Sequence, residues 1–370
     1  MIIPIKKNSN RIEVLDGIRG IAILLVVLFH YINNPLWFNY SNNIIIKILK
    51  NTTYFGWVGV DLFFVLSGFL IGGILLRNRQ STKYFSTFYT RRVLRIIPVY
   101  FLLLILFYIL QFSIGDEHYY IFRKPLPAWS YFTFTQNIFM GLRGHFGSEG
   151  LTPTWSLAIE EQFYLLCPLL IWLVNPRYLI YVLIGAICAA PVFRYFSSNW
   201  YQSYTWFTSR MDSLSFGVLC VYLYNKDSFK EFVTKYKAGI AIFVSLLGFL
   251  IFLLEVLFGS LGVLKHDIFA LFFSGLIIIS LSQPESLFAK ALRFKWLNLL
   301  GLISYSLYLF HDLFNGLFQQ IFLKHLNPVL NNLNDVLVSI FALAASLLFS
   351  SILYLFVESP AIKFGKTFTY

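Results

Sequence analysis

Charged residues are scarce in this chain of 370 residues, where Asp, Glu, Lys and Arg together make up 12%. A soluble globular domain carries about a quarter charged residues, so the composition argues against one. Hydrophobic residues reach 58% and the mean hydropathy is +0.70, which indicates an integral membrane protein. The aromatic share of 19% suits interfacial belts of a helical bundle better than the weak alternating strands of a β-barrel. The predicted fold class is therefore all-α, a polytopic bundle of transmembrane helices.

Cysteine is also rare, with only Cys167, Cys188 and Cys220. All three lie in apolar stretches and show neither a paired framework nor the spacing of metal ligands. They are predicted to be packing residues, and no metal site is expected. The sequence also lacks a P-loop, a dinucleotide fingerprint and a nucleophile elbow, which excludes several common enzyme classes.

The chain is rich in long apolar runs. A spanning helix needs roughly 20 apolar residues, and this criterion predicts about ten spans. They lie near 18–34, 57–76, 95–113, 156–174, 178–193, 211–224, 238–257, 267–283, 297–322 and 334–357. We expect one membrane domain over 1–370 with no fused extracellular esterase-like domain. The longest outer connection, about 114–155, either lines an entrance for a substrate or merely covers the bundle.

The net charge of +12 has two readings, nucleic-acid binding or membrane topology. With a cytoplasmic start, the inner segments hold about 20 of the 29 Lys and Arg residues, as the positive-inside rule predicts. Lys6, Lys7 and Arg11 begin this set ahead of a retained first span. Both termini are therefore predicted to be cytoplasmic, and no nucleic-acid partner is expected.

The first span, "LDGIRGIAILLVVLFHY", sets an arginine, Arg19, and a histidine, His30, inside a mainly apolar run. They are eleven residues apart, which is about three helical turns and about 16 Å, on nearly the same face. Ionisable groups inside a membrane are costly and normally face a bundle interior or a wet cavity. His30 is suited to proton transfer near neutral pH, although it could also be a structural histidine bonded to a neighbouring helix.

The stretch "FYTRRVLRIIPVY" clusters Arg91, Arg92 and Arg95 before Pro98, at the predicted cytoplasmic start of the third span. Arginine suits phosphate because its planar guanidinium makes two parallel charged hydrogen bonds, and a helix N-terminus adds a favourable dipole. The cluster predicts a phosphate site, and a positive-inside anchor is the alternative.

The stretch "TPTWSLAIEEQFYLLCPLLI" buries Glu160 and Glu161 below the outer surface of the fourth span. Their side chains point about 100° apart, so at most one of them can face the cavity of His30. That carboxylate would orient or charge-stabilise the imidazole, as the third group of a catalytic triad does. The alternative is an inter-helix ion pair with Arg210 or Arg194.

Other polar residues in the predicted spans are candidates for lining a cavity. "GLISYSLYLFHDLF" contributes a group that includes Asp312, and "SRMDSLSFG" opens the sixth span with an arginine and an aspartate. Small residues such as Gly68 more often allow close helix packing than chemistry. The candidates are Asp16, Ser67, Trp155, Ser156, Tyr164, Arg210, Asp212, Ser304, Tyr305 and His311.

Seven stretches, in order, carry a resemblance to a known family. They are "LDGIRGIAILLVVLFH", "FFVLSGFLI", "RRVLRIIP", "WSLAIEEQFYL", "RMDSLSFG", "GLISYSLYLFH" and "VESP". Together they resemble the acyltransferase-3 family, polytopic bacterial membrane O-acyltransferases that modify cell-surface carbohydrates. The resemblance implies about ten spans, an acyl-coenzyme A donor, usually acetyl-CoA, and an acceptor hydroxyl on an outward-facing sugar or glycolipid.

The family's basic residue, ten-residue gap and histidine fall on Arg19 and His30, and its arginine motif falls on Arg92 and Arg95. We therefore expect His30 to act as general base, assisted by Glu160 or Glu161, and Arg19, Arg91, Arg92 and Arg95 to hold the donor phosphates. The expected acceptor is a cell-surface carbohydrate or lipid-linked glycan, of the O-antigen, lipopolysaccharide or exopolysaccharide type. The expected location is the bacterial cytoplasmic (inner) membrane, with membrane lipids as further partners.

A proton-coupled secondary transporter or flippase for a cell-envelope glycan is the rival function. Buried His and Glu would then form a proton relay. This function explains the span count equally well, but it does not explain the arginine cluster, and the sequence shows no duplicated halves. The acceptor sugar, the acyl chain length, and direct transfer against a covalent acyl-enzyme all stay open at this point.

Overall fold

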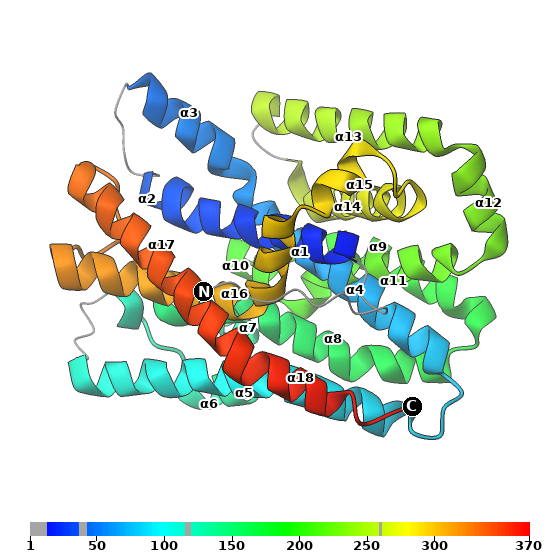
Figure 1. Cartoon of the computed structure of the whole chain (residues 1–370), viewed down its shortest axis with the longest axis horizontal. Helices are drawn as coiled ribbons and strands as arrows, with labels where there is room; N and C mark the ends of the chain where they lie inside the picture. The colour runs from blue at the N-terminus through cyan, green and yellow to red at the C-terminus, as the bar shows by residue number, and fades with distance from the viewer. Residues whose placement is uncertain (1–12, 37–42, 115–119, 259–260) are drawn as a thin grey trace.

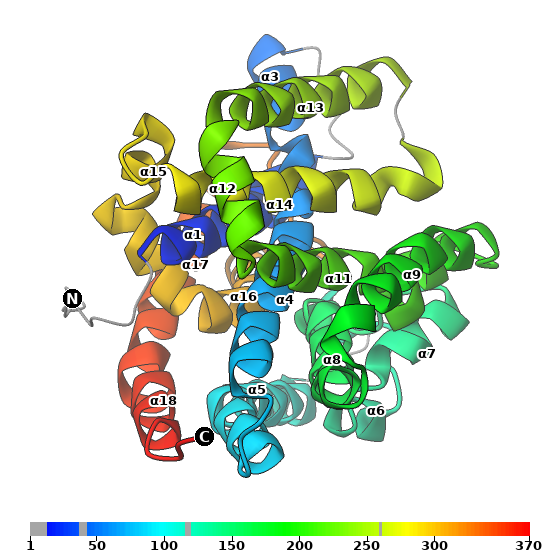
Figure 2. The same cartoon turned by 90° about the vertical axis from the view of Figure 1, so that its right-hand side faces the viewer.

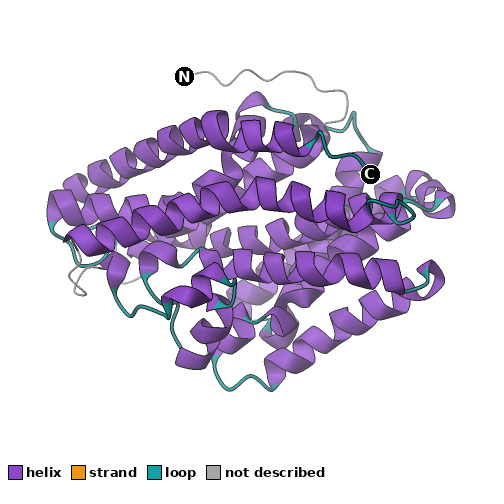
Figure 3. Cartoon of the chain, turned by 90° about the horizontal axis from the view of Figure 1, so that it is seen from below, coloured by secondary structure: helices purple, strands orange, loops and turns teal. Residues whose placement is uncertain are grey.

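The computed structural model describes residues 13–36, 43–114, 120–258 and 261–370, so Lys6, Lys7 and Arg11 lie outside the described residues. Within these ranges the chain consists of helices and loops, without a strand (Figure 3). Nine described segments are long and apolar enough to cross a membrane. They are Glu13–Leu36, Ile44–Asn78, Tyr84–Ile114, Glu149–Leu173, Pro176–Tyr195, Lys237–Glu255, Gly262–Ser282, Lys295–Leu323 and Leu333–Gly365. The predicted polytopic helical bundle is confirmed.

The difference from the predicted ten spans lies in α11 (Phe207–Tyr224), which is not among the nine. Its first half carries Arg210, Asp212 and three serines, all buried or nearly so. Helices α4 (Gly59–Asn78), α9 (Pro176–Tyr195) and α14 (Lys265–Ser282) surround it. A helix enclosed by protein can be more polar than one that faces lipid, because its neighbours satisfy its polar groups.

The remaining helices follow the chain in a regular order. They are α1 (Glu13–Leu28), the π-helical turn η1 (Phe29–Asn33), α2 (Asn34–Leu36), α3 (Ile44–Thr53), α5 (Tyr84–Ile114), α6 (Ala128–Phe132), α7 (Gln136–Arg143), α8 (Thr154–Leu173), α10 (Trp200–Thr205), α12 (Asp227–Lys235), α13 (Lys237–Phe258), α15 (Leu287–Leu292), α16 (Lys295–Leu323), α17 (Leu333–Leu353) and α18 (Ser359–Gly365). Short 3₁₀ turns, η2 (Tyr54–Val58), η3 (Tyr120–Phe122), η4 (Glu149–Leu151) and η5 (Gly262–Leu264), and a second π-helical turn, η6 (Tyr354–Glu358), connect or extend them.

The long helices run side by side along the long axis of the molecule (Figures 1 and 3). In Figure 1 the right-hand end gathers the end of α4, the turn into α5, α12 and the C-terminus, whereas α2 and the turn between α16 and α17 lie at the opposite end. Turned by 90°, the molecule shows α4 in its middle, next to α11 and α16 (Figure 2). Helix α4 is therefore the central helix of the bundle.

Glycines bring the central helices into backbone contact. A Cβ atom added at Gly68 of α4 would lie 2.0 Å from the carbonyl oxygen of Leu214, and one at Gly217 of α11 would lie 2.1 Å from that of Val65. Small residues permit such close approach between membrane helices, which confirms the packing role expected of Gly68. Helices α1 and α16 meet in the same way, since a Cβ at Gly301 would lie 2.0 Å from the Asp16 carbonyl oxygen.

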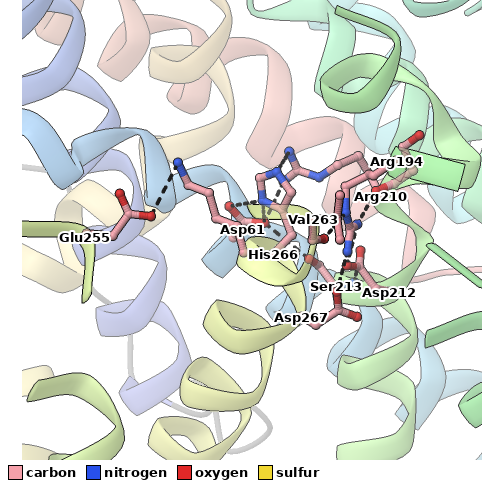
Figure 4. Close-up of polar contacts among 11 residues, drawn as sticks. Asp61, Arg194, Arg210, Asp212, Ser213, Glu255, Val263, His266 and Asp267 are labelled. Atoms are coloured by element: carbon pink, nitrogen blue, oxygen red, sulfur yellow. Dashed lines mark hydrogen bonds and ion pairs between the residues drawn. The ribbon is translucent and has the colours of Figure 1, made fainter. Parts of the chain in front are cut away.

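Two buried ion-pair clusters tie the same helices together (Figure 4). Nη2 of Arg210 lies 2.6 Å from Oδ1 of Asp61, and Nδ1 of His266 lies 3.2 Å from the same carboxylate oxygen. Nη1 of Arg194 lies 2.8 Å from Oδ2 of Asp212, and its other terminal nitrogen contacts Asp267. Both clusters cross helix boundaries, so they stabilise α4, α9, α11 and α14 as one unit.

This arrangement corrects two expectations. Arg210 and Asp212 line neither of the two cavities described below, and each forms a buried ion pair instead. The ion pairs of Arg210 and Arg194 go to aspartates and not to Glu160 or Glu161, so the alternative role predicted for those glutamates is wrong as well. Among the cysteines, Cys167 and Cys220 are buried packing residues as predicted, whereas Cys188 is exposed.

We expect Gly217→Ala to destabilise the bundle, because the new methyl group collides with backbone atoms that cannot move aside. Overpacking of this kind costs about 1–3 kcal/mol. Gly185→Ala in α9 is the matched control, since a Cβ there has no neighbour within 4 Å. Thermal unfolding of the purified full chain in detergent measures the stability of both variants. An unchanged midpoint for Gly217→Ala would contradict the close α4–α11 contact.

We expect Asp61→Ala to be strongly destabilising, because it leaves the Arg210 guanidinium buried without its counter-charge. Breaking one side of a buried pair costs about 3–5 kcal/mol. The double variant Asp61→Ala/Arg210→Met removes both charges and should be less destabilised than Asp61→Ala alone. The same unfolding measurement tests this, with Asp227→Ala as control because Asp227 forms an exposed pair with Lys230. Simple additivity of the two single substitutions would contradict the pair.

Candidate functional site

The first cavity, here called the arginine cavity, has a volume of about 420 Å³. Helices α1, α4, α5, α8 and α16 contribute its walls. Most of the polar residues predicted from the sequence meet here, namely Asp16, Arg19, Ser67, Arg92, Arg95, Ser156, Glu160, Tyr164, Ser304 and Tyr305. Polar residues from five helices, far apart in the sequence, therefore line one cavity.

The cavity is rich in cations that lack carboxylate partners. Arg92 and Arg95 lie one turn apart on α5, and no described carboxylate lies within ion-pair distance of either. The Arg92 guanidinium instead lies 5.8 Å from the ring centres of Phe88 and Tyr164, and its buried Nε has no hydrogen-bond partner. Arg19 has only a loose contact with Asp16 at 3.7 Å. Guanidiniums without close carboxylate partners suit a phosphorylated ligand. The helix N-terminus expected beside them is absent, because α5 begins at Tyr84, about two turns before Arg92.

Two arginines differ from the sequence-based expectation. Arg91 does not line the arginine cavity, because its Nε donates to the Phe368 carbonyl at 2.9 Å and its guanidinium lies over the Tyr370 ring. Arg77 at the end of α4 does line it, although it was not among the site residues predicted from the sequence. Arg77 lies ten residues after Ser67, which is about 80° around the helix, so helical spacing from that serine does not identify it.

Glu160 lies in the arginine cavity and not beside His30. The Tyr164 hydroxyl donates to Oε2 of Glu160 at 3.2 Å and lies 2.7 Å from Oγ of Ser67. Glu161 lines neither cavity described here, and its buried Oε1 has no hydrogen-bond partner. The structure therefore does not bring either glutamate to His30, and the predicted pairing is wrong. The reason is the rotation of α8, which sequence spacing does not define relative to α1.

The second cavity, here called the histidine cavity, has a volume of about 760 Å³ and contains His30. The predicted outer connection contributes to it through Phe146, Glu149, Thr152 and Pro153, which supports its interpretation as the lining of an entrance. The other walls are rich in aromatic rings, with Trp200 stacked on Tyr204 at 4.7 Å and Trp155 at 4.6 Å from the same ring. A large pocket that combines aromatic walls with polar groups pointing to one place is typical of a ligand site.

His30 occupies the π-helical turn η1, a local irregularity that often marks a functional position. Its Nδ1 lies 2.9 Å from the carbonyl oxygen of Val26. A carbonyl can only accept, so Nδ1 carries the proton and the lone pair of Nε2 is available. His30 is therefore held in the tautomer that a general base requires.

His311 lies directly against His30, with the ring centres 4.8 Å apart and the rings nearly perpendicular. The same reasoning gives it the same tautomer, because its Nδ1 lies 2.8 Å from the carbonyl oxygen of Tyr308. Its Nε2 is buried without a hydrogen-bond partner. His311 does not itself line either cavity, so it contacts the site through His30.

Two carboxylates take the place that sequence reasoning had given to Glu160 or Glu161. Glu149 and Asp312 both line the histidine cavity with His30. Glu149 accepts from the Thr152 hydroxyl at 3.0 Å. The cavity's cations are engaged elsewhere, since Arg194 is paired with two aspartates and Lys265 lies 3.8 Å from Glu255. Glu149 was missed because it lies in a connection and not in a predicted span.

The two cavities adjoin each other. Val60 and Tyr308 line both of them, so the same two side chains separate the arginines from His30. The Tyr308 hydroxyl lies 2.6 Å from Oγ of Ser156. Within the described residues, no group of three His, Cys, Asp or Glu side chains is arranged to hold a metal ion.

Comparison with known proteins gives the family. A family model described as an acyltransferase domain matches residues 12–355. The chain is 27% identical over 382 residues to the O-acetyltransferase OatA of Staphylococcus aureus (strain NCTC 8325 / PS 47), covering 96% of this chain and 58% of that protein. It is 26% identical over 371 residues to the peptidoglycan O-acetyltransferase OatA of Listeria monocytogenes serovar 1/2a, covering 95% of this chain and 56% of that protein.

The chain thus spans less than three-fifths of the length of these relatives. No solved structure matches it significantly. The family model covers nearly the whole membrane bundle, including both cavities, and agrees with the resemblance carried by the seven sequence stretches. The chain belongs to the acyltransferase-3 family.

Proposed function

We propose that the chain is a membrane O-acetyltransferase that moves an acetyl group from acetyl-CoA to a hydroxyl of a carbohydrate. The observation that carries this proposal is the pair of adjoining cavities, one with unpaired arginines and the other with a histidine whose Nε2 is available. The arginine cavity suits a phosphorylated donor, and the histidine cavity suits an acceptor that must lose a proton. The relatives named O-acetyltransferases support the same reaction.

The donor occupies the arginine cavity in this proposal. Arg19, Arg92 and Arg95 bind its phosphates by charged hydrogen bonds, which are stronger than neutral ones. The pantetheine arm then extends along α4 toward Val60 and Tyr308, which brings the thioester to the wall shared with His30. The positive-inside pattern supports a cytoplasmic position for the arginine end of the bundle, on the side of the proposed donor.

The acceptor enters the histidine cavity, between the aromatic walls. We infer a cell-surface carbohydrate or lipid-linked glycan, because one relative is named for peptidoglycan and the aromatic rings offer flat apolar faces. The protein would act as a multi-pass protein of the bacterial cytoplasmic membrane.

In the reaction, Nε2 of His30 takes the proton of the acceptor hydroxyl as its oxygen attacks the thioester carbonyl carbon. The carbon–oxygen bond forms, the tetrahedral intermediate collapses, and the carbon–sulfur bond breaks. The leaving thiolate recovers the proton from His30. The Val26 carbonyl keeps the ring oriented, and the carboxylates of Glu149 and Asp312 stabilise the imidazolium that forms in between.

The Tyr308 hydroxyl is the donor best placed to stabilise the oxyanion, since it lies at the wall between the cavities and accepts from or donates to Ser156. The same residues would serve a direct transfer and a route through a covalent acyl-enzyme.

The proposal is tested with the purified full chain, radiolabelled acetyl-CoA and a crude envelope carbohydrate fraction, scored for label in the carbohydrate. Transfer of label supports it. Counterflow of an unmodified glycan without label transfer would identify a transporter or flippase instead, the function for which His30, His311 and the buried carboxylates would form a proton relay.

We expect His30→Ala to abolish transfer while the protein folds normally, because His266, the other histidine that lines this cavity, is engaged through both ring nitrogens with Asp61 and Arg210. His145→Ala is the matched control, since His145 lines neither cavity and serves a local turn through Gly147. Label transfer and size-exclusion chromatography measure both variants. Near-normal turnover of His30→Ala would exclude the assigned base.

We expect the double variant Arg92→Gln/Arg95→Gln to bind acetyl-CoA at least tenfold more weakly, because each charged hydrogen bond contributes about 1.5–3 kcal/mol. Binding of the acceptor should be unaffected. The control is Arg91→Gln, whose side chain is engaged with Phe368 and Tyr370 outside the cavity. Equilibrium binding of acetyl-CoA measures the difference. Equal donor affinity in the double variant and in the control would disprove the phosphate role.

A further inference from the structure

Helix α4 lines the arginine cavity along almost its whole length. Val60 lies at the wall shared with the histidine cavity, Ser67 lies between, and Arg77 lies near the far end of the helix. Seventeen residues separate Val60 from Arg77, which is about 25 Å at 1.5 Å per residue. The cavity is therefore an elongated channel, with Arg77 at its mouth.

The Arg77 side chain is directed back into this channel. Its Nε donates to the Gly73 carbonyl oxygen at 3.0 Å, one turn earlier on α4. The terminal nitrogens Nη1 and Nη2 have no hydrogen-bond or ion-pair partner among the described residues, although the side chain belongs to the cavity wall. Arg79, two residues later, is different, because its Nη2 donates to the carbonyl oxygens of Trp172 and Val174.

Arg77 and Arg92 occupy two separate levels of the channel. Arg92 lies near the level of Ser67, since Tyr164 bonds to Ser67 and its ring lies 5.8 Å from the Arg92 guanidinium. The Arg77 guanidinium lies near the level of Gly73, six residues further along α4, which is about 9 Å. The channel thus offers two positively charged positions about 9 Å apart along one axis.

We propose that Arg77 binds the 3′-phosphate of coenzyme A, while Arg19, Arg92 and Arg95 hold its 5′-diphosphate. This inference rests on the proposed function, because it takes acetyl-CoA as the donor. Coenzyme A carries its phosphates as two groups separated by a ribose, a diphosphate near the pantetheine arm and a phosphomonoester at the outer end. The order of these groups matches the order of the two arginine levels from the shared wall to the mouth.

The consequence is a rule of donor selection. Arg77 makes the protein favour free acyl-CoA over donors with a pantetheine arm but no 3′-phosphate, such as 3′-dephospho-CoA. A phosphomonoester carries two negative charges and offers several acceptor oxygens to a planar guanidinium. Removal of the 3′-phosphate should therefore weaken binding of the donor strongly. The phosphate of a lipid headgroup has the same chemistry and is the other source that could reach the exposed Arg77.

The test measures binding of CoA and of 3′-dephospho-CoA to the full chain in phosphatidylcholine nanodiscs by calorimetry. We expect the unmodified protein to prefer CoA by about tenfold, which corresponds to about 1.4 kcal/mol. Arg77→Gln should lose about tenfold in CoA affinity and stay within about twofold for 3′-dephospho-CoA. The matched control Arg79→Gln should keep the preference, because Arg79 contacts only backbone carbonyls.

Three outcomes overturn the inference, and they are distinguishable. Equal weakening of both ligands by Arg77→Gln, with the preference intact, shows that Arg77 acts only on the shape of the channel. No preference in the unmodified protein, combined with weaker CoA binding when phosphatidylglycerol is added, shows that Arg77 is a lipid anchor. Failure of both ligands to bind the unmodified protein at all rejects acetyl-CoA as the donor and, with it, the proposed function.

Discussion

The buried pair of Arg210 and Asp61 is the interaction on which the bundle depends most. Both side chains are fully enclosed, and their contact crosses from α11 to α4. A guanidinium within a membrane bundle is tolerable only with a counter-charge or a strong acceptor beside it. The pair therefore fixes α11 against α4 at one register, and the glycine contacts of Gly68 and Gly217 then bring the two backbones together. Because α4 lines both cavities, their shape follows from this contact.

The arginines of this chain differ in their contact partners. This difference distinguishes the arginines with a structural role from those that line the first cavity. Arg79, Arg91, Arg194 and Arg210 are engaged with backbone carbonyls, aromatic rings or aspartates. The arginines that line the first cavity also have local contacts, Arg77 with a backbone carbonyl and Arg92 with two rings. Within the described part of the chain, none of them has a carboxylate partner except the loose one of Arg19. Desolvating an unpaired cation is costly, so the arginines gathered in this cavity are the structural argument for the proposed anionic donor. Composition alone could not make this distinction, since all these residues count equally toward the net charge.

The spacing of residues in the sequence predicted those parts of the site whose residues lie on a single helix. Arg19 and His30 share a face of the first span, and Arg92 and Arg95 share a turn of α5, so their placement followed from helix geometry. The pairing of His30 with Glu160 or Glu161 failed because it depends on the rotation of α8 relative to α1. Glu149 was not predicted because it lies in a connection, where neither periodicity nor hydropathy gives a signal. Helix α11 was predicted as a span because its second half is apolar, yet its first half is the most protected polar segment of the bundle.

The wall between the cavities is where the proposed acyl transfer would take place. Val60 closes the boundary with an apolar side chain, and Tyr308 closes it with a ring held through Ser156. A transporter needs two alternating openings and therefore a boundary that moves as a body. Acyl transfer needs only that a thioester and a hydroxyl meet at one point of the wall, which two side chains can provide. His30 and His311 lie on the far side of that wall with their Nδ1 protons given to their own helices. The fixed backbone thus determines which ring nitrogen of His30 is available for the reaction, before any substrate is bound.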